Sequence, residues 1–416
     1  MSLFPSRRTF LQAASGGMAA MALSARSYAR VAGANERISI GVIGCGGRGL
    51  KAHMPGVQKW ARQENIEITA VADPWRPRRE EAAAQVAEWF GRPARQFVSY
   101  RQVLELADVD AVMIASPDHQ HAMQLQAAAE AKKDAYVEKP LAMDMASLFA
   151  CCDAVKAAGI VVQVGTQVRS YPTSTGCREL FRQGVLGKVS RIEQCRNGSR
   201  PYWYSYVQRQ AKAEEVDWAE FLAGRPMRPF RSDLLTGWYG YREFSDGPIA
   251  NLGCHFIDLV HYITGARYPA SAVALGGTFT WKDQHGFTCP DHAQALWIYP
   301  EGFMVSYSSN FGNAGGNTFR IYGDQGVMNL TNWQRPTVSG EGGSKKGKLG
   351  KEVPVEPIDT PDHFLDWLRC LRTRRACNAP IEAGYQHAVA VIMAMRAFDT
   401  GRRQIYDHSK REIREG

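Results

Sequence analysis

The lysine of the triplet Glu138-Lys139-Pro140 is a candidate catalytic residue because of its position in the sequence. Residues 134–138 predict a short buried strand, and ligands of an open α/β sheet bind beyond the carboxyl ends of its strands. Beside a nicotinamide, a lysine there can hydrogen-bond a substrate hydroxyl and stabilise the alkoxide that forms as hydride leaves. Pro140 restricts Lys139 to extended or turn conformations. A solvated turn is the alternative, so the surrounding elements decide between the two.

A glycine-rich turn supplies a second set of candidate residues. Residues 37–43 predict a buried strand that leads into Gly44-Cys45-Gly46-Gly47-Arg48-Gly49, and a helix is expected to follow through about residue 62. The glycines permit a tight turn and let main-chain N–H groups approach a pyrophosphate at the helix N-terminus. The residues of this turn predicted to bind a dinucleotide are Gly44, Gly46, Gly47, Arg48 and Gly49.

An acidic residue bears on which dinucleotide is bound. Asp73 ends the second predicted strand, residues 66–73, where its carboxylate can bond a ribose 2′-hydroxyl. Its charge would repel a 2′-phosphate, which favours NAD. Arg76, Arg78 and Arg79 follow closely and could accommodate that phosphate, so NADP stays open. The alternative role for Asp73 is to cap the next helix.

Further apolar runs complete a parallel sheet. Residues 110–115, 134–138 and 160–164 predict strands, separated by helices that end near residue 133 and span residues 143–158. Buried apolar strands that alternate with helices indicate a doubly wound α/β domain. The strand over residues 110–115 ends in the polar run Ser116-Pro117-Asp118-His119-Gln120-His121.

After residue 165 the pattern changes to alternating segments, which are typical of half-buried strands. They cover residues 188–196, 272–281, 293–299, 304–311, 318–322 and 327–330. This pattern indicates a large, mostly antiparallel sheet with helices on one face. Two late helices are predicted over residues 362–373 and 384–400, and residues 339–351 are predicted to form a loop rich in Gly, Lys and Ser.

The first 29 residues resemble a twin-arginine export signal. Arg7 and Arg8 precede a weakly apolar stretch over residues 10–23, and Ser27-Tyr28-Ala29 offers a small-residue cleavage site. No segment approaches the roughly 20 apolar residues that a membrane helix needs. We therefore expect a periplasmic protein that the twin-arginine machinery exports and that is not integral to the membrane. A disordered basic N-terminus is the alternative.

Composition argues against several other classes of protein. The net charge of +9 is spread along the chain without a dense basic helix, so nucleic-acid binding is not expected. The nine cysteines are irregularly spaced and include no CxxC pair, which favours free buried thiols over a disulfide scaffold. The length exceeds one ordinary core, so we expect a nucleotide-binding domain over residues 36–166 and a second domain over residues 167–416.

Taken together, these motifs resemble the Gfo/Idh/MocA family of sugar-active oxidoreductases. The match covers the glycine turn, Asp73, residues 116–121 and the Glu138 triplet, and it continues through residues 165–169, 216–218 and 251–258. The resemblance implies a C-terminal α/β domain whose open sheet mediates homo-oligomer contacts. It also implies sugar or cyclitol substrates and a nicotinamide lying above Lys139.

The resemblance assigns Lys139 and His255 as the catalytic pair, with His255 as general acid/base. A core histidine on an apolar helix is the alternative for His255. Family members commonly carry an acid at the position of Asn251, and an amide cannot take a proton, so Asn251 can only orient other groups. His119 and His121 lack an evident third ligand, so no metal is expected.

The remaining assignments follow from the same match. Asp118 and His119 match a strand-end motif that flanks the nicotinamide ribose. The cofactor-binding residues beyond the turn and Asp73 are Ser116, Pro117, Asp118, His119, His121, Glu138 and Lys139. The substrate-binding residues are Gln167, Arg169, Tyr171, Asn251 and His255, and a structural role is the alternative for Arg169. An aromatic group, Tyr202, Trp203, Tyr204 and Tyr206, suits the faces of a sugar, and core packing explains it equally well.

Export affects the expected reaction. Outside the cytoplasm no dissolved NAD pool can be assumed, so an exported member should keep its NAD tightly bound and restore it within each cycle. This favours paired oxidation and reduction of sugars, epimerisation, or cleavage of a glycoside by transient oxidation, elimination and reduction. A dehydrogenase that releases NADH and a non-catalytic sugar sensor are the alternatives.

Overall fold

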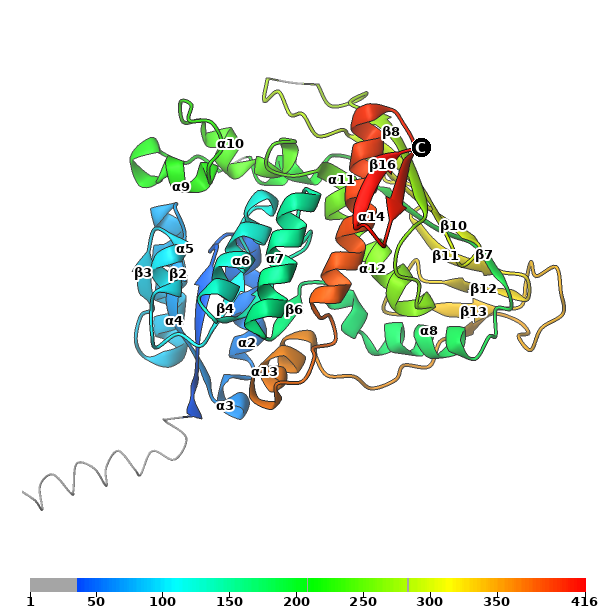
Figure 1. Cartoon of the computed structure of the whole chain (residues 1–416), viewed down its shortest axis with the longest axis horizontal. Coiled ribbons are helices and arrows are strands. Elements are labelled where there is room, and N and C mark those ends of the chain that lie inside the picture. The colour runs from blue at the N-terminus through cyan, green and yellow to red at the C-terminus, as the bar shows by residue number, and fades with distance from the viewer. Residues whose placement is uncertain (1–35, 208, 283) are drawn as a thin grey trace, which may run out of the picture.

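The computed structural model describes residues 36–416, apart from residues 208 and 283, and contains two sheets that lie side by side (Figure 1). The first sheet is parallel, with the strand order β3-β2-β1-β4-β5-β6 of a doubly wound nucleotide-binding fold. Its strands are β1 Ile38–Ile43, β2 Ile66–Ala72, β3 Arg95–Phe97, β4 Ala111–Ile114, β5 Asp134–Val137 and β6 Val162–Val164. The α/β fold class predicted from the sequence is confirmed.

Helices cover both faces of the parallel sheet. One face packs on α5 Tyr100–Leu104, α6 His121–Glu130 and α7 Met145–Ala158, and the other on α2 Met54–Gln58 and α4 Arg76–Phe90. The single helix expected after the glycine turn is wrong: η2 Gly49–His53, α2 and α3 Ala61–Glu64 replace it. The face with α2 and α4 is completed by α13 His363–Thr373, whose Trp367 shares a buried cluster with Ile40.

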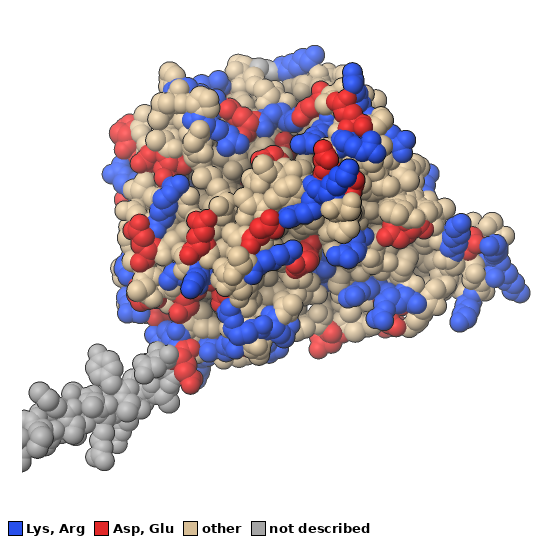
Figure 2. All heavy atoms as spheres, in the orientation of Figure 1, with Lys and Arg blue, Asp and Glu red and all other residues tan. Residues whose placement is uncertain are grey.

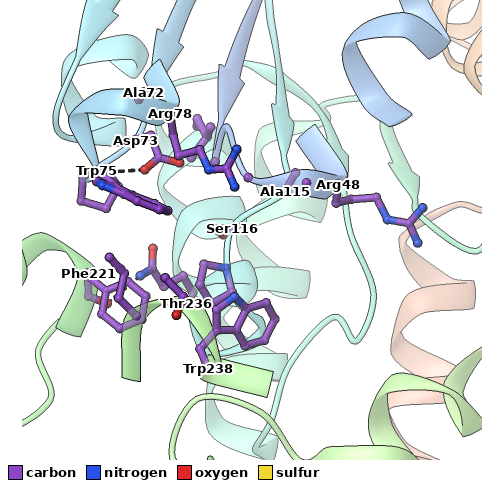
Figure 3. A pocket seen from close by; sticks show the side chains of 18 of the residues that line it. Arg48, Ala72, Asp73, Trp75, Arg78, Ala115, Ser116, Phe221, Thr236 and Trp238 are labelled. Atoms are coloured by element: carbon purple, nitrogen blue, oxygen red, sulfur yellow. Dashed lines mark hydrogen bonds between the residues drawn. The ribbon is translucent and has the colours of Figure 1, made fainter. Parts of the chain in front are cut away.

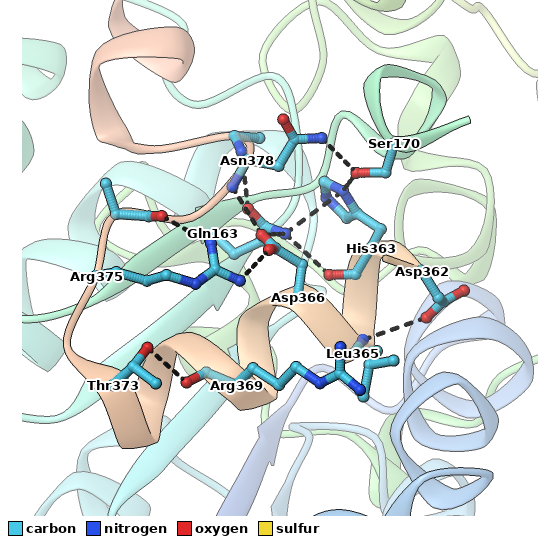
Figure 4. Close-up of polar contacts among 12 residues, drawn as sticks. Gln163, Ser170, Asp362, His363, Leu365, Asp366, Arg369, Thr373, Arg375 and Asn378 are labelled. Atoms are coloured by element: carbon cyan, nitrogen blue, oxygen red, sulfur yellow. Dashed lines mark hydrogen bonds and ion pairs between the residues drawn. The ribbon is translucent and has the colours of Figure 1, made fainter. Parts of the chain in front are cut away.

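A buried polar network holds α13 against β6 (Figure 4). Gln163 donates through Nε2 to the carbonyl of His363 at 2.9 Å. The carboxylate of Asp366 accepts from Arg375 at 2.6 Å and from the main-chain N–H of Asn378 at 2.7 Å. Within the described part of the chain, the one group near enough to hold a metal ion is Asp366, Cys370 and Cys377. Both oxygens of Asp366 already accept hydrogen bonds, one of them from a cationic guanidinium.

The second sheet has ten strands in the order β14-β13-β12-β11-β7-β10-β9-β8-β15-β16. Only β7 and β10 pair in parallel, so the expected mostly antiparallel sheet is confirmed. Its strands are β7 Val189–Asn197, β8 Ser271–Gly277, β9 His292–Tyr299, β10 Phe303–Asn310, β11 Thr318–Gly323, β12 Gly326–Asn329, β13 Thr337–Ser339, β14 Val353–Pro354, β15 Gln404–Asp407 and β16 Glu412–Glu415.

Helices α8 Pro172–Arg182, α12 Gly253–Thr264 and α14 Ile381–Thr400 cover one face of this sheet. On the opposite face, β8 and β9 expose apolar side chains: Val273, Leu275, Leu296 and Ile298. Figure 2 shows basic and acidic side chains interspersed over the side of the molecule that it draws. None of the helices in the described residues has the length and apolar character needed to cross a membrane.

Candidate functional site

A cavity of about 590 Å³ lies where β1, β2 and β4 end (Figure 3). Its sheet-side wall contains Gly44, Gly46, Gly47, Arg48, Asp73, Ser116 and Pro117, all of which the sequence predicted to bind a cofactor. Its opposite wall comes from residues 201–246, here named the cover segment. The cover segment contributes Tyr206, Phe221, Thr236, Trp238 and Tyr239. The cavity is therefore a cleft between the parallel sheet and a segment that comes later in the chain.

The cover segment is fastened to the loops that follow the strands. The main-chain N–H of Asp217 donates to the carbonyl of Pro74 at 3.0 Å, and Glu220 accepts from Ser99 Oγ at 2.8 Å. Gln120 donates through Nε2 to the carbonyl of Phe221 at 2.8 Å. Figure 1 shows α9 Trp218–Leu222 and α10 Ser232–Thr236 of this segment above the ends of the strands. A ligand in the cavity would thus be enclosed from both sides.

The glycine turn has the shape that a phosphate needs. Gly44 has a φ of 87°, which L side chains rarely adopt, and a Cβ on Gly49 would lie 2.1 Å from the carbonyl oxygen of Gly44. Gly46 and Gly47 face open space, because a Cβ added to either would have no atom within 4 Å. Gly44 and Gly49 therefore shape the turn, and Gly46 and Gly47 leave its backbone accessible to a ligand. These residues fit the pyrophosphate of a dinucleotide.

Asp73 lines the cavity, and each of its oxygens already accepts a main-chain hydrogen bond. Oδ2 accepts from the N–H of Cys45 and Oδ1 from that of Trp75, both at 2.8 Å. Burial raises the pKa of Asp73 to about 6. The side chain does not cap α4, whose N-cap residue is Trp75 and has no side-chain cap. Of the three nearby arginines, Arg78 alone lines the cavity, and its guanidinium pairs with Glu81 at 2.9 Å.

Lys139, Asn251 and Asp118 meet in one hydrogen-bonded group. Lys139 donates through Nζ to the carbonyl of Asn251 at 2.8 Å, and the Asn251 amide donates to Asp118 Oδ2 and to Ser245 Oγ, both at 2.7 Å. Burial raises the pKa of Asp118, which is 3% exposed. These residues do not themselves line the cavity, but Asp118 directly follows Pro117, which does. The ammonium of Lys139 retains hydrogen-bonding capacity for another partner.

His255 follows Asn251 by one helical turn, with a break between α11 Gly247–Asn251 and α12. Burial, and then the charge of Lys139, lower the pKa of His255 to about 3. Its Nδ1 is buried and has no hydrogen-bond partner within the described ranges. The imidazole is therefore neutral near pH 7, and its unprotonated ring nitrogen can accept a hydrogen bond. Its ring centroid lies 6.4 Å from that of Trp333.

Glu138 lies behind the cavity instead of lining it. Its Oε1 is 2.9 Å from His53 Nε2 and 3.4 Å from Arg48 Nε, and it accepts from Gln167 Nε2 at 2.8 Å. Burial alone would raise the pKa of Glu138, but Arg48 and His53 hold it well below its usual range. Arg48 is 42% exposed by side chain and lines the cavity. Glu138 thus anchors Arg48, which faces the cleft. Neither Glu138 nor Gln167 lines the cavity.

The structure gives main-chain contacts to the two histidines of the strand-end motif. The ring nitrogens of His121 lie 2.8 Å from the carbonyls of Pro140 and Ser116. His119 Nε2 lies 3.1 Å from the carbonyl of Phe221 in the cover segment. Both rings are outside the cavity lining, so the contacts that the structure shows for them brace the surrounding loops.

Two residues predicted to bind substrate have other contacts. The guanidinium of Arg169 pairs with both oxygens of buried Asp258, at 2.6 Å and 3.1 Å. Tyr171 packs against the main core at the start of α8. These contacts favour a structural role for both residues. Neither residue lines the cavity.

Sequence reasoning missed most of the cover segment's contribution. Tyr202, Trp203 and Tyr204 belong to a packed cluster with Phe311, whereas Tyr206 lines the cavity. Trp238 and Tyr239 also line it and stack on each other with ring centroids 3.7 Å apart. The density of aromatic residues between 201 and 246 was the available signal, but it did not distinguish cavity from core.

Two family models match the chain. The model of the oxidoreductase family with an NAD-binding Rossmann fold, GFO_IDH_MocA, matches residues 38–166. The model of the GFO/IDH/MocA C-terminal domain matches residues 176–329. Together the two matches span about two thirds of the chain.

Individual relatives are distant. Levoglucosan dehydrogenase of Pseudarthrobacter phenanthrenivorans is 28% identical over 246 residues, 57% of this chain and 54% of that protein. The NAD(+)-dependent scyllo-inositol 2-dehydrogenase of Bacillus subtilis is 31% identical over 124 residues, 29% of this chain and 34% of its own length. The chain spans about half the length of the curated relatives it matches.

Solved structures share the fold. The aldose-aldose oxidoreductase of Caulobacter crescentus, in complex with glycerol, superposes with a TM-score of 0.66 at 20% identity. That alignment covers 88% of this chain and 99% of the other. At this identity the likeness concerns the fold alone.

Proposed function

Because the chain belongs to the Gfo/Idh/MocA family of oxidoreductases, we propose that it transfers hydride between a sugar or glycoside and a tightly bound nicotinamide dinucleotide. The dinucleotide would be restored within each cycle, so that the net reaction is redox-neutral. The observation that carries this proposal is the enclosed cavity, with the glycine turn on one wall and the fastened cover segment on the other. The named activity of levoglucosan dehydrogenase supports a sugar-like substrate.

The residues that would hold the dinucleotide form one continuous surface. The accessible backbone at Gly46 and Gly47 would bind the pyrophosphate, with Arg48 as the adjacent positive charge. Asp73 would face the adenosine ribose, which favours NAD over NADP. Tyr206 and Tyr239 would lie over the opposite end of the cavity. When bound, the nicotinamide accepts or returns the hydride.

Two side chains would manage the proton at the reacting carbon. His255, whose Nδ1 has no partner within the described residues, would take the hydroxyl proton as hydride leaves and give it back on reduction. Lys139 would hold the same oxygen and stabilise its negative charge, fixed in place by its bond to the carbonyl of Asn251. Asp118 orients Asn251 and so acts through it.

The decisive experiment uses purified protein to which no NAD is added. Mass spectrometry of a denatured extract should detect roughly one nicotinamide dinucleotide per chain. A panel of sugars and glycosides should then be converted through many turnovers without accumulation of the reduced-nicotinamide absorbance band. Released aglycone would identify glycoside cleavage by transient oxidation. Steady NADH release that requires added NAD would replace the redox-neutral proposal with an ordinary dehydrogenase.

Export is the second part of the proposal, and it rests on the sequence because residues 1–29 lie outside the described residues. We expect the double change Arg7→Lys and Arg8→Lys to hold the full-length protein in the cytoplasm, folded and loaded with cofactor. Cell fractionation and blotting for the mature form would test this. Undiminished export of the double variant would refute the signal.

Self-association is the third part. The exposed side chains Val273, Leu275, Leu296 and Ile298 lie on neighbouring strands β8 and β9, which pair Val273 with Leu296. Such an apolar patch suits a second copy of the chain. Light scattering of Leu275→Lys, compared with the unchanged protein, should show a smaller particle; an unchanged size would contradict this interface.

A further inference from the structure

Arg196 is a half-buried cation on the side of β7 that faces the helices. Ile192 and Gln194, four and two residues earlier, are both buried, and alternate residues of a strand share one face. The guanidinium carbon of Arg196 lies 5.8 Å from the ring centroid of Trp333. Trp333 is also the aromatic neighbour of His255, at 6.4 Å between ring centroids. Trp333 therefore connects Arg196 to the proposed proton-transfer residue.

No counter-charge is shown for this guanidinium. Across residues 36–416 as described, the guanidinium of Arg196 forms no ion pair and no hydrogen bond, and it lies over the ring of Trp333. Arg191 on the same strand pairs with Glu193, and buried Arg169 pairs with Asp258 at 2.6 Å. A cation withdrawn from water without a partner is costly. An anionic ligand would offset that cost.

The carboxylates near the reaction centre are already engaged. Glu138 is 4% exposed and lies 3.4 Å from Arg48, whose charge offsets its own, and Asp118 is 3% exposed and bound to Asn251. Lys139 adds a second positive charge beside His255. Lys139 and Arg196, each of which is linked to His255 by the contacts above, are thus two cations that an anionic ligand could meet.

We propose that the substrate is a sugar that carries an anionic group, a carboxylate or a phosphate, and that Arg196 binds this group. Trp333 would pack against the sugar ring, with the reacting hydroxyl at Lys139 and His255. Arginine suits such a group because its planar fork can donate two parallel hydrogen bonds. This inference rests on the proposed function and adds the class of sugar to it.

The test is a calorimetric titration of the purified protein with matched neutral and anionic sugars. The ligands are glucose, glucuronate and glucose 6-phosphate, together with galactose and galacturonate. The unchanged protein should bind at least one anionic sugar about 10–100-fold more tightly than its neutral partner, the range expected of a charge-assisted bond. Comparison of glucuronate and galacturonate with glucose 6-phosphate shows whether the site prefers a carboxylate or a phosphate.

The Arg196→Met variant should lose that preference while its affinity for neutral sugars stays the same. Arg178→Met is the matched control, because Arg178 also lies over an aromatic ring, that of Tyr262 at 4.8 Å, and has no ion pair within the described residues. The control should keep the preference. Equal affinity for every neutral and anionic pair, or a preference that survives in Arg196→Met, would overturn the proposal.

A second measurement separates failure of the anion site from failure of the proposed function. Reduction of the bound nicotinamide by sugar reports on hydride transfer, whereas calorimetry reports on the anion. Suppose that neutral sugars transfer hydride equally in the unchanged protein and in Arg196→Met, and that neither protein prefers anionic sugars. This result overturns the anionic substrate and leaves the proposed function intact. Binding preference without any hydride transfer overturns the proposed function and supports the anion site.

Discussion

Two buried carboxylates, Glu138 and Asp258, have similar charge partners and different surroundings. Each contacts an arginine and a histidine: Glu138 faces Arg48 and His53, and Asp258 faces Arg169 and His387. Both carboxyl groups are buried, and in both the cationic partners hold the pKa below its usual value against the effect of burial. The arginines differ in exposure, since Arg48 is 42% exposed and Arg169 is 10% exposed. The histidines differ as well, because burial lowers the pKa of His53 whereas Cys254 and Asp258 raise that of His387.

This difference separates a site from a structural core. The partners of Asp258 are almost entirely buried, so that group is closed and offers nothing to a ligand. Glu138 fixes one end of Arg48 and leaves the arginine at the cavity wall. The same carboxylate accepts from the main-chain N–H of Lys139 at 3.1 Å, which links the cation to the proposed catalytic lysine. A buried anion that anchors a half-exposed cation therefore marks functional geometry better than burial of charge alone.

The largest expected effect is catalytic. Lys139→Ala and His255→Ala should each lower turnover by about 10²–10⁴-fold, as expected for loss of a positioned acid or base, while bound dinucleotide is retained. Single-turnover kinetics and mass spectrometry of the cofactor measure the two quantities. Arg169→Lys, as a change in the closed cluster, should affect stability more than turnover. Near-normal activity of Lys139→Ala would show that chemistry takes place elsewhere.

The next largest effect contrasts the two carboxylates directly. Asp258→Asn leaves Arg169 and His387 buried without a counter-charge and should lower the free energy of unfolding by about 3–5 kcal/mol. Glu138→Gln should lower it less, because water can hydrate the exposed part of Arg48, and should mainly weaken dinucleotide retention. Urea denaturation measures the free energy of unfolding of each variant, and mass spectrometry measures its cofactor content. Equal destabilisation by both changes would remove the distinction between the clusters.

The closed cluster should also make stability depend on pH. Burial alone would lower the pKa of His387, but Cys254 and Asp258 raise it to about 9, above its ordinary value of 6.5. Its stabilising contribution is fully present below pH 6.5 and is lost as pH rises through 9. The free energy of unfolding should fall over that interval by an amount on the order of 3 kcal/mol. His387→Gln should flatten this slope, and a slope unchanged in the variant would assign it to other groups.

The smallest effect tests the anchor behind the cavity. A Cβ on Gly165 would lie 2.8 Å from the carboxylate carbon of Glu138, so Gly165→Ala should displace this side chain and cost about 1–3 kcal/mol. Dinucleotide retention should weaken as Arg48 loses its anchor. Gly350→Ala is the control, because no atom lies within 4 Å of its Cβ position. A fully stable Gly165→Ala with normal retention would show that Glu138 has room to move.

Local patterns were sufficient to predict much of the fold. Parallel strands buried on both faces are continuous apolar runs, and half-buried strands alternate, so most of the longer strands could be recognised. The short strands β13 to β16 have two to four residues each and too little sequence for a period to appear. The break after α2 falls near Lys59, whereas the Pro55-Gly56 pair that could signal a break lies inside α2.

The site was predictable where a residue's position depends on its own strand. Lys139 closely follows β5, and Gly46 closely follows β1, so their places at the sheet edge could be inferred. Arg169 was not predictable in this way, because its partner Asp258 is 89 residues away. The helices of the cover segment have only three to five residues each, and the placement of the segment depends on contacts with distant loops such as that between Gln120 and Phe221.

The return of α13 to the parallel sheet has a consequence for the order of folding. Phe364, Trp367 and Leu368 bury part of the face formed by Ile40 and Val42, more than 300 residues earlier. During synthesis, that face of the first sheet stays exposed until α13 has been made. The nucleotide-binding half should therefore reach its full cooperativity only once α13 is available to pack on it. A chain truncated before His363 should leave an apolar sheet surface open to aggregation and to chaperones.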